Sequence, residues 1–289
     1  MEMFLAYLKH EKRYSANTVI SYRNDLEQFY QYINKAFDIE NISEVSHLYI
    51  RSWMAQMSED NMGARSINRK ISALRSYCKF LMKRGLLEKD PTIKIQPPKT
   101  TKRLPVYVER QDIGKLFELV EFEDNFNGRR DRMVLELLYN TGMRRAELLS
   151  LKDSDVDTAR QYIKVLGKGN KERLIPVSQQ MASSLDAYMK EKRAVHGSGW
   201  LMVTDKGAQL YPEMAYRIVK KFLSLVTTIE KRSPHVLRHT FATHLTNNGA
   251  EINAVKDLLG HASLAATQVY THNNIEQLKD IYKSTHPKA

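Results

Sequence analysis

Ile95-Gln-Pro-Pro-Lys-Thr-Thr-Lys-Arg-Leu-Pro105 decides how this chain of 289 residues is organised. Its three prolines remove amide donors and disfavour helix, so this stretch holds the chain extended. Segments with helical apolar periodicity lie on both sides of it. The length also suits two domains, at roughly 100–200 residues each. We therefore predict one domain over residues 1–95, a linker over 96–104 and a second domain over 105–289.

Two amphipathic helices are predicted upstream of the linker. In the first, apolar residues recur at helical spacing from Tyr22 to Ile33, and Ser15 or Asn17 is placed to cap it. The second runs from Ala64 to Met82, and its apolar stripe is Ile67, Ile71, Leu74, Cys78 and Leu81. The first hundred residues therefore predict a small all-helical bundle.

Positive charge is concentrated beside this second helix. The chain carries 45 Lys and Arg against 33 Asp and Glu, a net charge of +12, which is typical of proteins with a polyanionic partner such as nucleic acid. Residues 62–103 alone hold twelve basic and two acidic residues. Arg65, Arg69, Lys79 and Lys83 lie largely away from the apolar stripe. Such a face either lies against a phosphate backbone or is the solvated face of a bundle helix.

Composition excludes several classes of protein. Hydrophobic residues make up 42% and charged residues 27%, as in ordinary globular proteins, which excludes disordered and collagen-like chains. No apolar run of membrane-spanning length and no signal-peptide pattern is seen, so we expect a cytoplasmic protein with no membrane partner. Cys78 is the single cysteine, so neither an internal disulfide nor a cysteine-rich zinc site is expected.

The second domain is predicted to be mostly helical with one β interruption. The segments 162–165 and 172–177 are typical of short strands, and the turn-forming stretch Leu166-Gly-Lys-Gly-Asn-Lys171 joins them. This hairpin presents Lys168 and Lys171 at its tip. The predicted fold class is mainly α: a helical bundle followed by a mostly helical domain with a small antiparallel hairpin or sheet.

Two further segments place arginines near helix starts. In Leu138-Tyr-Asn-Thr-Gly-Met-Arg-Arg-Ala-Glu-Leu148, Gly142 interrupts an apolar helix, and Arg144 begins the next one just past a tight turn. In Ser233-Pro-His-Val-Leu-Arg-His-Thr-Phe-Ala-Thr-His244, Ser233 and Pro234 are typical of an N-cap and a first helical residue. His235 and Arg238 then share one face of that helix.

The last such segment is Leu258-Leu-Gly-His-Ala-Ser-Leu-Ala-Ala-Thr-Gln-Val-Tyr-Thr-His272. Gly260 is expected to end one helix, with His261 in the following turn and Tyr270 on the next helix. Each of these side chains, taken alone, also has an ordinary structural or solvated interpretation. A zinc site through His235 and His239 is disfavoured, because the HExxH pattern is absent and no third ligand is evident.

Taken together, these residue types suit phosphoryl transfer. Two arginines supply forked donors for phosphate oxygens, and they stabilise charge that develops in a transition state. A tyrosine hydroxyl can attack a phosphodiester and hold it covalently, while histidine and lysine move protons. No cluster of Asp and Glu accompanies them to hold two metal ions, so a metal-free route through the tyrosine fits better.

The constellation resembles the tyrosine recombinase (phage integrase) family. The segments TGMRRAEL, GKGNKERLIPV, HVLRHTFATHL and LLGHASLAATQVYTH resemble the family's arginine box, hairpin lysine, histidine–arginine box and histidine–tyrosine box, in the family's order. Their spacings agree, and we see no departure at the six motif positions. The segment SANTVISYRNDLEQFYQYI and the basic helix resemble the family's core-binding domain, so the resemblance covers nearly the whole chain. The compact form looks most like the bacterial XerC/XerD group.

The resemblance implies a role for each motif residue. Tyr270 is the expected nucleophile, which forms a 3′-phosphotyrosyl bond, and Lys168 the expected general acid toward the leaving 5′-oxygen. Arg144 and Arg238 are expected to bind the scissile phosphate. His235 is expected to assist as acid or base, and His261 to hydrogen-bond the phosphate. No metal or ATP is required for strand cleavage and transfer.

The resemblance also implies partners. The family acts as a tetramer on two double-stranded DNA recombination sites, through a Holliday junction. A homo- or heterotetramer is therefore expected, with a possible second recombinase and a possible FtsK-type translocase. Asn273 and Glu276 resemble a capping box, and Ile275, Leu278, Ile281 and Tyr282 form an apolar stripe. In this family such a C-terminal helix docks on a neighbouring protomer, although it could instead dock on its own domain.

The expected function is Xer-type chromosome dimer resolution by a nucleoid-associated cytoplasmic recombinase. A mobile-element integrase or invertase would use the same chemistry. Three competing hypotheses are a type IB topoisomerase, a non-catalytic DNA-binding protein of the same fold and a zinc hydrolase. The complete catalytic set disfavours the non-catalytic protein. The two domains and the tail disfavour the topoisomerase.

Overall fold

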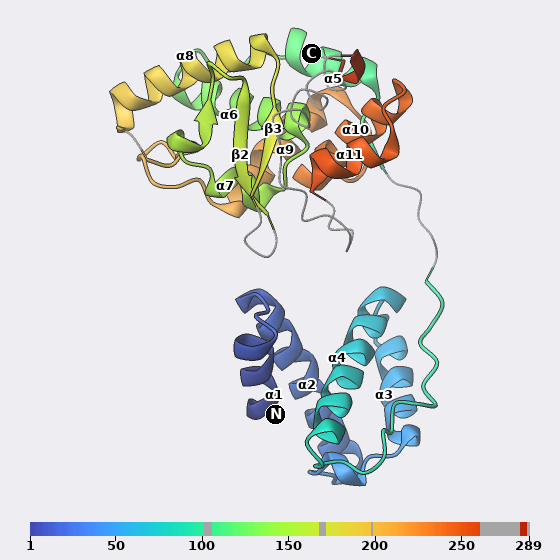
Figure 1. The fold of residues 1–289 in the computed structure, drawn as a ribbon. Helices are drawn as coiled ribbons and strands as arrows, with labels where there is room; N and C mark the ends of the chain where they lie inside the picture. The colour runs from blue at the N-terminus through green and yellow to red at the C-terminus, as the bar shows by residue number, and fades with distance from the viewer. Residues whose placement is uncertain (101–105, 168–171, 198, 261–283, 288–289) are drawn as a thin grey trace. The chain divides into compact units, whose positions relative to one another are not determined.

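The computed structural model describes residues 1–100, 106–167, 172–197, 199–260 and 284–287 (Figure 1). The chain forms two compact units, Met1–Arg103 and Leu104–Ala289. Each unit has its own hydrophobic core. Within the described residues, no helix is long and apolar enough to cross a membrane.

The first unit is a helical bundle. Its elements are α1 (Glu2–Ala6), a π-helical turn (Tyr7–Glu11), α2 (Ala16–Phe37), a 3-10 turn (Ile42–Glu44), α3 (His47–Glu59) and α4 (Ala64–Lys83). The long helix α2 contacts both α3 and α4. Ser15 caps α2, because its hydroxyl accepts a hydrogen bond of 3.3 Å from the amide of Thr18.

The helix α4 buries the predicted apolar stripe. Ile67, Ile71, Leu74, Cys78 and Leu81 are all buried in the core of the first unit. Burial raises the pKa of the Cys78 thiol to about 12, so the single cysteine is a neutral core residue. The predicted amphipathic helix is therefore confirmed.

A buried carboxylate joins α2 to α4. Asp25 accepts a hydrogen bond of 3.0 Å from the buried ammonium of Lys70 and a second one from the guanidinium of Arg69. Arg69 also donates to the hydroxyl of Ser21 at 2.6 Å. The two cations compensate the desolvated carboxylate and fix the crossing of the two helices.

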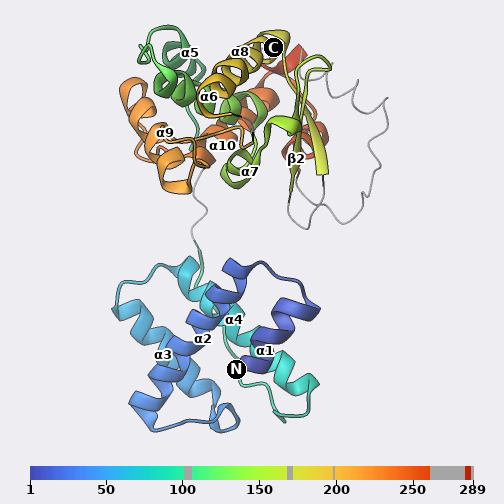
Figure 2. The same ribbon diagram turned by 90° about the vertical axis from the view of Figure 1, so that its left-hand side faces the viewer.

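The second unit is mostly helical. Its elements are α5 (Arg110–Glu118), α6 (Phe126–Thr141), α7 (Arg145–Ser150), a 3-10 turn (Asp153–Asp155), β1 (Val156–Asp157), β2 (Tyr162–Leu166), β3 (Glu172–Pro176), α8 (Gln179–His196), α9 (Pro212–Val226), α10 (Pro234–Asn247) and α11 (Ile252–Leu259). The helix α6 lies at its centre and contacts α7, α8, α9 and α10 (Figure 2). Its leucines and Tyr139 are fully buried.

The sheet is antiparallel and has the strand order β1-β2-β3. In its register Ile163 pairs with Ile175, and Val165 pairs with Arg173. All four of these side chains are buried, because alternate residues of a strand point to one face. The predicted hairpin is confirmed, and so is the predicted fold class of mainly α with a small antiparallel sheet. The third strand, β1, is two residues long and carries no periodicity to predict it.

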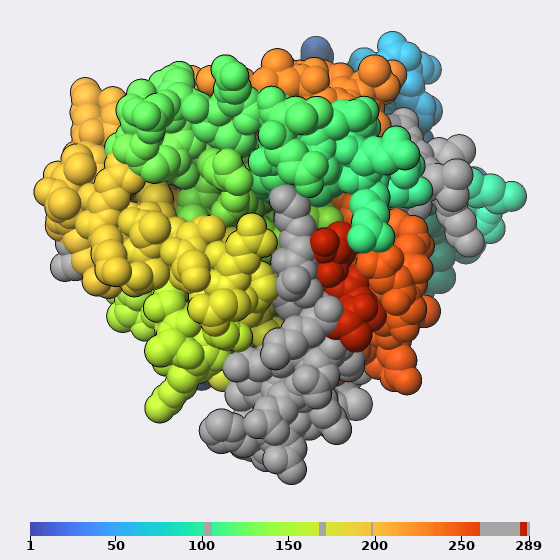
Figure 3. Space-filling model, turned by 90° about the horizontal axis from the view of Figure 1, so that it is seen from above, coloured from blue at the N-terminus to red at the C-terminus, as the bar shows by residue number. Residues whose placement is uncertain are grey.

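Residues 284–287 lie against α10. The side-chain amide of Asn248 donates to the carbonyl oxygen of Thr285 at 2.6 Å, and the ring of His286 packs on Tyr139 and Phe241. Figure 3 shows residues 284–287, in red, beside the orange surface of α10 and α11. The predicted C-terminal docking helix, with Asn273, Glu276 and its apolar stripe, lies outside the described residues.

Candidate active site

Arg144 stands between two helices, as the sequence predicts. Gly142 is the C-cap of α6, with a left-handed φ of 58°, and Arg144 is the N-cap of α7. Its amide donates to Oε2 of Glu147 at 2.7 Å, and its Nη1 donates to Oε1 at 2.8 Å. The turn and the carboxylate together fix the direction of the guanidinium.

Arg238 reaches the same region from α10. Its side chain is buried; Nη1 donates to the carbonyl oxygen of Gly142 at 2.6 Å, and Nη2 to that of Leu259 at 2.7 Å. Ser233 is the N-cap of α10 and Pro234 opens the helix, as predicted, but the Ser233 side chain makes no capping hydrogen bond. The predicted start of this helix is therefore confirmed.

Three arginines converge on the C-terminus of α11, and we call Arg144, Arg173 and Arg238 the arginine cluster. Arg173 Nε donates to the carbonyl oxygen of Leu258 at 3.1 Å, Arg238 to Leu259 and Arg144 Nη2 to Gly260 at 3.1 Å. These successive carbonyls lie at the negative end of the helix, where they lack partners within it. Three separate parts of the chain are thereby joined to α11.

Glu147 is the carboxylate of this cluster. Burial alone raises its pKa, but hydrogen bonds and charge from Arg173, and further bonds from Arg144, outweigh burial and lower the pKa to about 2. Burial and the charge of Arg144 lower the pKa of Arg238 to about 10. Two guanidinium groups bond to this carboxylate, and the charge of the carboxylate also acts on Arg238. Three cations stand against one anion, and the excess positive charge suits a phosphate.

His235 lies at the start of α10 and is exposed, whereas Arg238 three residues later is buried. Partial desolvation lowers the pKa of the imidazole below 6.5, and neighbouring positive groups add to the effect: His239, Arg145, Arg238 and Arg144. The imidazole is therefore neutral at pH 7, able to accept a proton or a hydrogen bond.

Four of the predicted site residues lie outside the described part of the chain: Lys168, Lys171, His261 and Tyr270. The structure thus brings Arg144 and Arg238 together at the end of α11, and the charges of both arginines act on His235. The described part of the last segment ends at Gly260, whose carbonyl oxygen accepts from Arg144. The predicted DNA-binding residues of α4 are all exposed and belong to the first unit: Arg65, Arg69, Lys79 and Lys83. Of these, Arg69 is engaged by Asp25.

Sequence reasoning missed Glu147 and Arg173. Both stand inside the predicted motif segments, but neither was assigned a role. Arg173 points to the same buried face of β3 as Ile175, two residues later. An arginine at such a position requires a buried partner. That alternation was the available signal. For Glu147, the signal was its position three residues after an N-cap.

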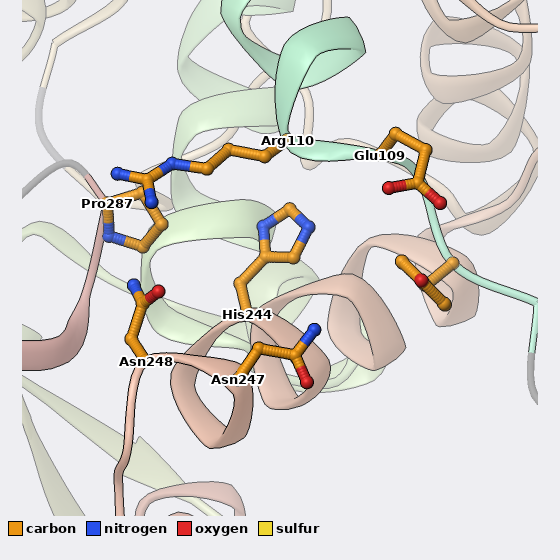
Figure 4. A pocket seen from close by; sticks show the side chains of 7 residues that line it. Glu109, Arg110, His244, Asn247, Asn248 and Pro287 are labelled. Atoms are coloured by element: carbon orange, nitrogen blue, oxygen red, sulfur yellow. The ribbon is translucent and has the colours of Figure 1, made fainter.

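A cavity lies elsewhere in the second unit. It has a volume of about 90 Å³ and is lined by Tyr107, Glu109, Arg110, His244, Asn247, Asn248 and Pro287 (Figure 4). None of the predicted site residues lines it. Within the described part of the chain, no group of three or more His, Cys, Asp or Glu side chains is arranged to hold a metal ion.

Comparisons with known proteins identify the family. Residues 107–277 match the phage integrase family, and residues 1–85 match the phage integrase N-terminal SAM-like domain. The chain is 36% identical to tyrosine recombinase XerC of Bacillus subtilis, over 100% of this chain and 96% of that protein. It is 35% identical to tyrosine recombinase XerD of Halalkalibacterium halodurans, over 100% of this chain and 98% of that protein.

A solved structure supports the fold. The XerH site-specific recombinase, bound to a palindromic difH substrate after cleavage, aligns with a TM-score of 0.74 and 22% identity, over 96% of this chain and 82% of that one. At that identity the likeness shows the architecture alone.

The family matches cover more than half of the chain, and the relatives are similar along nearly their whole length. The chain therefore belongs to the phage integrase family, the tyrosine recombinases.

Proposed function

We propose that this protein is a site-specific DNA recombinase that cuts and rejoins DNA through Tyr270. The tyrosine oxygen attacks the scissile phosphorus and loses its proton to His235 as base, the bond from phosphorus to the 5′-oxygen breaks, and a 3′-phosphotyrosyl link forms. Lys168 gives its proton to the leaving 5′-oxygen. Because the energy of the phosphodiester is kept in the protein–DNA link, rejoining by another 5′-hydroxyl needs no ATP.

The arginine cluster supports this proposal. Arg144 and Arg238 come from segments more than ninety residues apart, yet they donate to the adjacent carbonyls of Gly260 and Leu259. Their forked donors match phosphate oxygens and stabilise the charge that grows on them during attack. Gly260 immediately precedes His261 and stands ten residues before Tyr270. This meeting of two arginines beside the segment of the nucleophile is the observation that carries the proposal.

The remaining residues have supporting roles in the proposed reaction. His235, neutral at pH 7, accepts a proton or a hydrogen bond near the arginines. His261 hydrogen-bonds the scissile phosphate. The reaction needs no metal ion, because guanidinium groups supply the positive charge that metals supply in two-metal nucleases. In the first unit, the exposed cations of α4 contact the DNA backbone, and Lys171 adds a further contact from the second unit.

The relatives favour a role of the Xer type. Identity to a XerC and to a XerD protein is nearly equal, so the comparison favours the group without separating its two members. The proposed role is resolution of chromosome dimers in the cytoplasm, at the nucleoid. It is carried out by a tetramer on two recombination sites, with a partner recombinase and an FtsK-type translocase as candidate partners.

The test is covalent trapping on a nicked suicide DNA substrate in EDTA. Candidate sites come from DNA that flanks the gene and from the chromosome terminus region. Wild-type protein is expected to form a protein–DNA adduct, and Tyr270→Phe is expected to form none while binding the same DNA with nearly unchanged affinity. An adduct in EDTA establishes that cleavage is independent of metal.

Two results would contradict the proposal. A Tyr270→Phe variant that still forms the adduct would exclude Tyr270 as the nucleophile. Wild-type protein that binds the substrate but forms no adduct, even with a partner recombinase added, would exclude the catalytic assignment.

A further inference from the structure

Arg173 is the most buried arginine of the cluster. Its side chain is 5% exposed, whereas that of Arg144 is 34% exposed. A phosphate group can therefore approach Arg144 directly, while protein atoms cover Arg173. Arg238 is 8% exposed, so burial alone does not set Arg173 apart; the resemblance assigns a phosphate contact to Arg144 and Arg238 and none to Arg173. An effect of Arg173 on DNA cleavage is therefore expected to act through the residues that it touches.

Each nitrogen of the Arg173 guanidinium has a partner. Nη1 and Nη2 donate in parallel to Oε1 and Oε2 of Glu147, both at 2.8 Å, and Nε donates to the carbonyl oxygen of Leu258. This is the two-bonded geometry in which arginine holds a carboxylate most rigidly. One side chain of β3 thus fixes both α7 and the end of α11.

Glu147 passes this constraint on to Arg144. Oε1 accepts from Nη1 of both arginines, and Oε2 accepts from Nη2 of Arg173 and from the amide of Arg144. Without Arg173, the carboxylate would keep Arg144 as its single cation among these bonds. A carboxylate held on one side only would fix the direction of Arg144 less firmly. With Arg173 present, cations hold the carboxylate on both sides, and the carboxylate keeps Arg144 in place.

The backbone of Gly260 packs tightly on Arg173. Gly260 has a φ of 62°, and a Cβ there would lie 3.0 Å from Nη1 and 3.1 Å from Cδ of Arg173. The backbone at Gly260, just past the end of α11, therefore lies directly against this guanidinium. Arg173 therefore contacts both Glu147, which holds Arg144, and the backbone of Gly260.

We propose that Arg173 is a positioning residue for DNA cleavage. It holds Glu147 and the end of α11 so that Arg144 presents its guanidinium to the scissile phosphate. This inference rests on the proposed function of the cluster. The alternative is a purely structural ion pair, of the kind that the second unit also contains. Lys192, 1% exposed, donates to both carboxylate oxygens of Asp153 at 2.7 and 2.8 Å and to the carbonyl oxygen of Trp200 at 2.9 Å.

The experiment compares Arg173→Met, Arg173→Lys and the matched control Lys192→Met on the suicide substrate. Adduct formation is timed at saturating DNA, and each variant is assayed below its own melting temperature. Arg173→Met is expected to slow cleavage by about 10²-fold, the typical effect of a small misplacement of a catalytic group. Arg173→Lys, which keeps the charge but loses the fork, is expected to recover part of the rate. Lys192→Met is expected to lose stability but to cleave within about twofold of wild type, since its ion pair lies outside the cluster.

A pH profile separates positioning from stability. The charged groups that face Glu147 are Arg144 at the start of its own helix, Arg173 on β3 and Arg238 on α10. Removing Arg173 raises the pKa of Glu147. As the pH falls, the carboxylate therefore takes up its proton, and releases Arg144, at a higher pH than in wild type. The acid limb of the cleavage rate is therefore expected to move to higher pH in Arg173→Met. It is expected to stay in place in Lys192→Met and in the double variant Arg173→Met/Glu147→Gln, which has no carboxylate to titrate.

The outcomes separate this inference from the proposed function. Wild-type protein that forms no adduct contradicts the proposed function itself. An adduct from wild type, together with unchanged rates and unchanged acid limbs in both Arg173 variants, contradicts only the positioning role. If Arg173→Met does not fold, Arg173→Lys decides, since wild-type kinetics in that variant would overturn the inference.

Discussion

Arg238 donates a hydrogen bond of 2.6 Å to the carbonyl oxygen of Gly142, 96 residues earlier in the chain. Gly142 stands two residues before Arg144, so this bond fixes the second arginine of the site to the turn that carries the first. The acceptor is a backbone carbonyl oxygen, so the bond depends on the course of the chain at the turn. The geometry of the two arginines therefore depends on the conformation of Gly142.

Replacement of Gly142 by alanine is expected to destabilise the second unit and slow cleavage. Its φ of 58° is a left-handed conformation, which costs an L-residue about 1–2 kcal/mol. An added Cβ would also lie 2.3 Å from the ring of Phe241, and such overpacking typically costs about 1–3 kcal/mol more. Urea unfolding measures the first effect and adduct formation the second.

Gly114→Ala is the matched control for that substitution. Gly114 lies within α5, has no positive φ, and a Cβ there would meet nothing within 4 Å. Alanine is the better helix former by about 1 kcal/mol, so this variant is expected to be unchanged or slightly more stable. Equal stability of Gly142→Ala and Gly114→Ala would contradict the strain argument.

Glu147 is expected to make the stability of the protein depend on pH in the acid range. Its pKa falls from an ordinary 4.5 to about 2 on folding, so its contribution is fully present well above pH 4.5 and is lost as the pH falls toward 2. The whole contribution is about 3 kcal/mol, at 1.36 kcal/mol for each pKa unit. About 2 kcal/mol of it is expected to disappear between pH 6 and pH 3.

The measurement is the difference in unfolding free energy between wild type and Glu147→Gln at several pH values. Glutamine does not titrate, so the remaining carboxylates largely cancel in the difference. The advantage of wild type is expected to shrink steadily as the pH falls from 6 to 3. A difference that stays constant over that range would show that Glu147 keeps an ordinary pKa in the folded protein.

Local patterns predicted the fold well, because the segments that matter carry strong local signals. The apolar stripe of α4 has helical periodicity, and turn formers separate β2 from β3. Gly142 and Gly260 were predicted to end helices, and both cap them in the left-handed conformation. The two-residue strand β1 exists through its pairing with β2, so no periodicity in its own sequence predicts it.

The arginine cluster was harder to predict from the sequence. The boxes indicate that Arg144 and Arg238 act together, but the carbonyl oxygens that receive them belong to the backbone of α11 and have no sequence signature. The sequence gives no clear sign of the role of Arg173. It follows the lysine-bearing turn of the hairpin, where a cation is usually solvated. Its burial depends on Glu147, which is a long-range pairing.

His235 is expected to titrate below its ordinary pKa of 6.5. Partial desolvation lowers the pKa, and nearby positive charge, including that of Arg145, lowers it further. Arg145→Gln is therefore expected to raise the pKa of His235 toward 6.5, while Arg132→Gln, which removes an exposed arginine paired with Glu136, leaves it unchanged. NMR of ring-labelled histidines, assigned through His235→Asn, measures the pKa. A wild-type value at or above 6.5 would contradict the electrostatic description of the site.

The basic face of α4 is expected to dominate the salt dependence of DNA binding. Each phosphate contact contributes about −0.9 to the slope of log affinity against log salt, so the variant Arg65→Gln/Lys79→Gln/Lys83→Gln is expected to flatten the slope by about 2 to 3. Arg69→Gln is expected to flatten it by less than one full contact, because Asp25 already opposes that charge.

The control is Lys35→Gln, an exposed lysine near the end of α2, which is expected to leave the slope unchanged. Titration of labelled site DNA at several salt concentrations gives each slope. If the triple variant and Lys35→Gln have equal slopes, α4 is a solvated face of the bundle and the DNA contacts lie elsewhere.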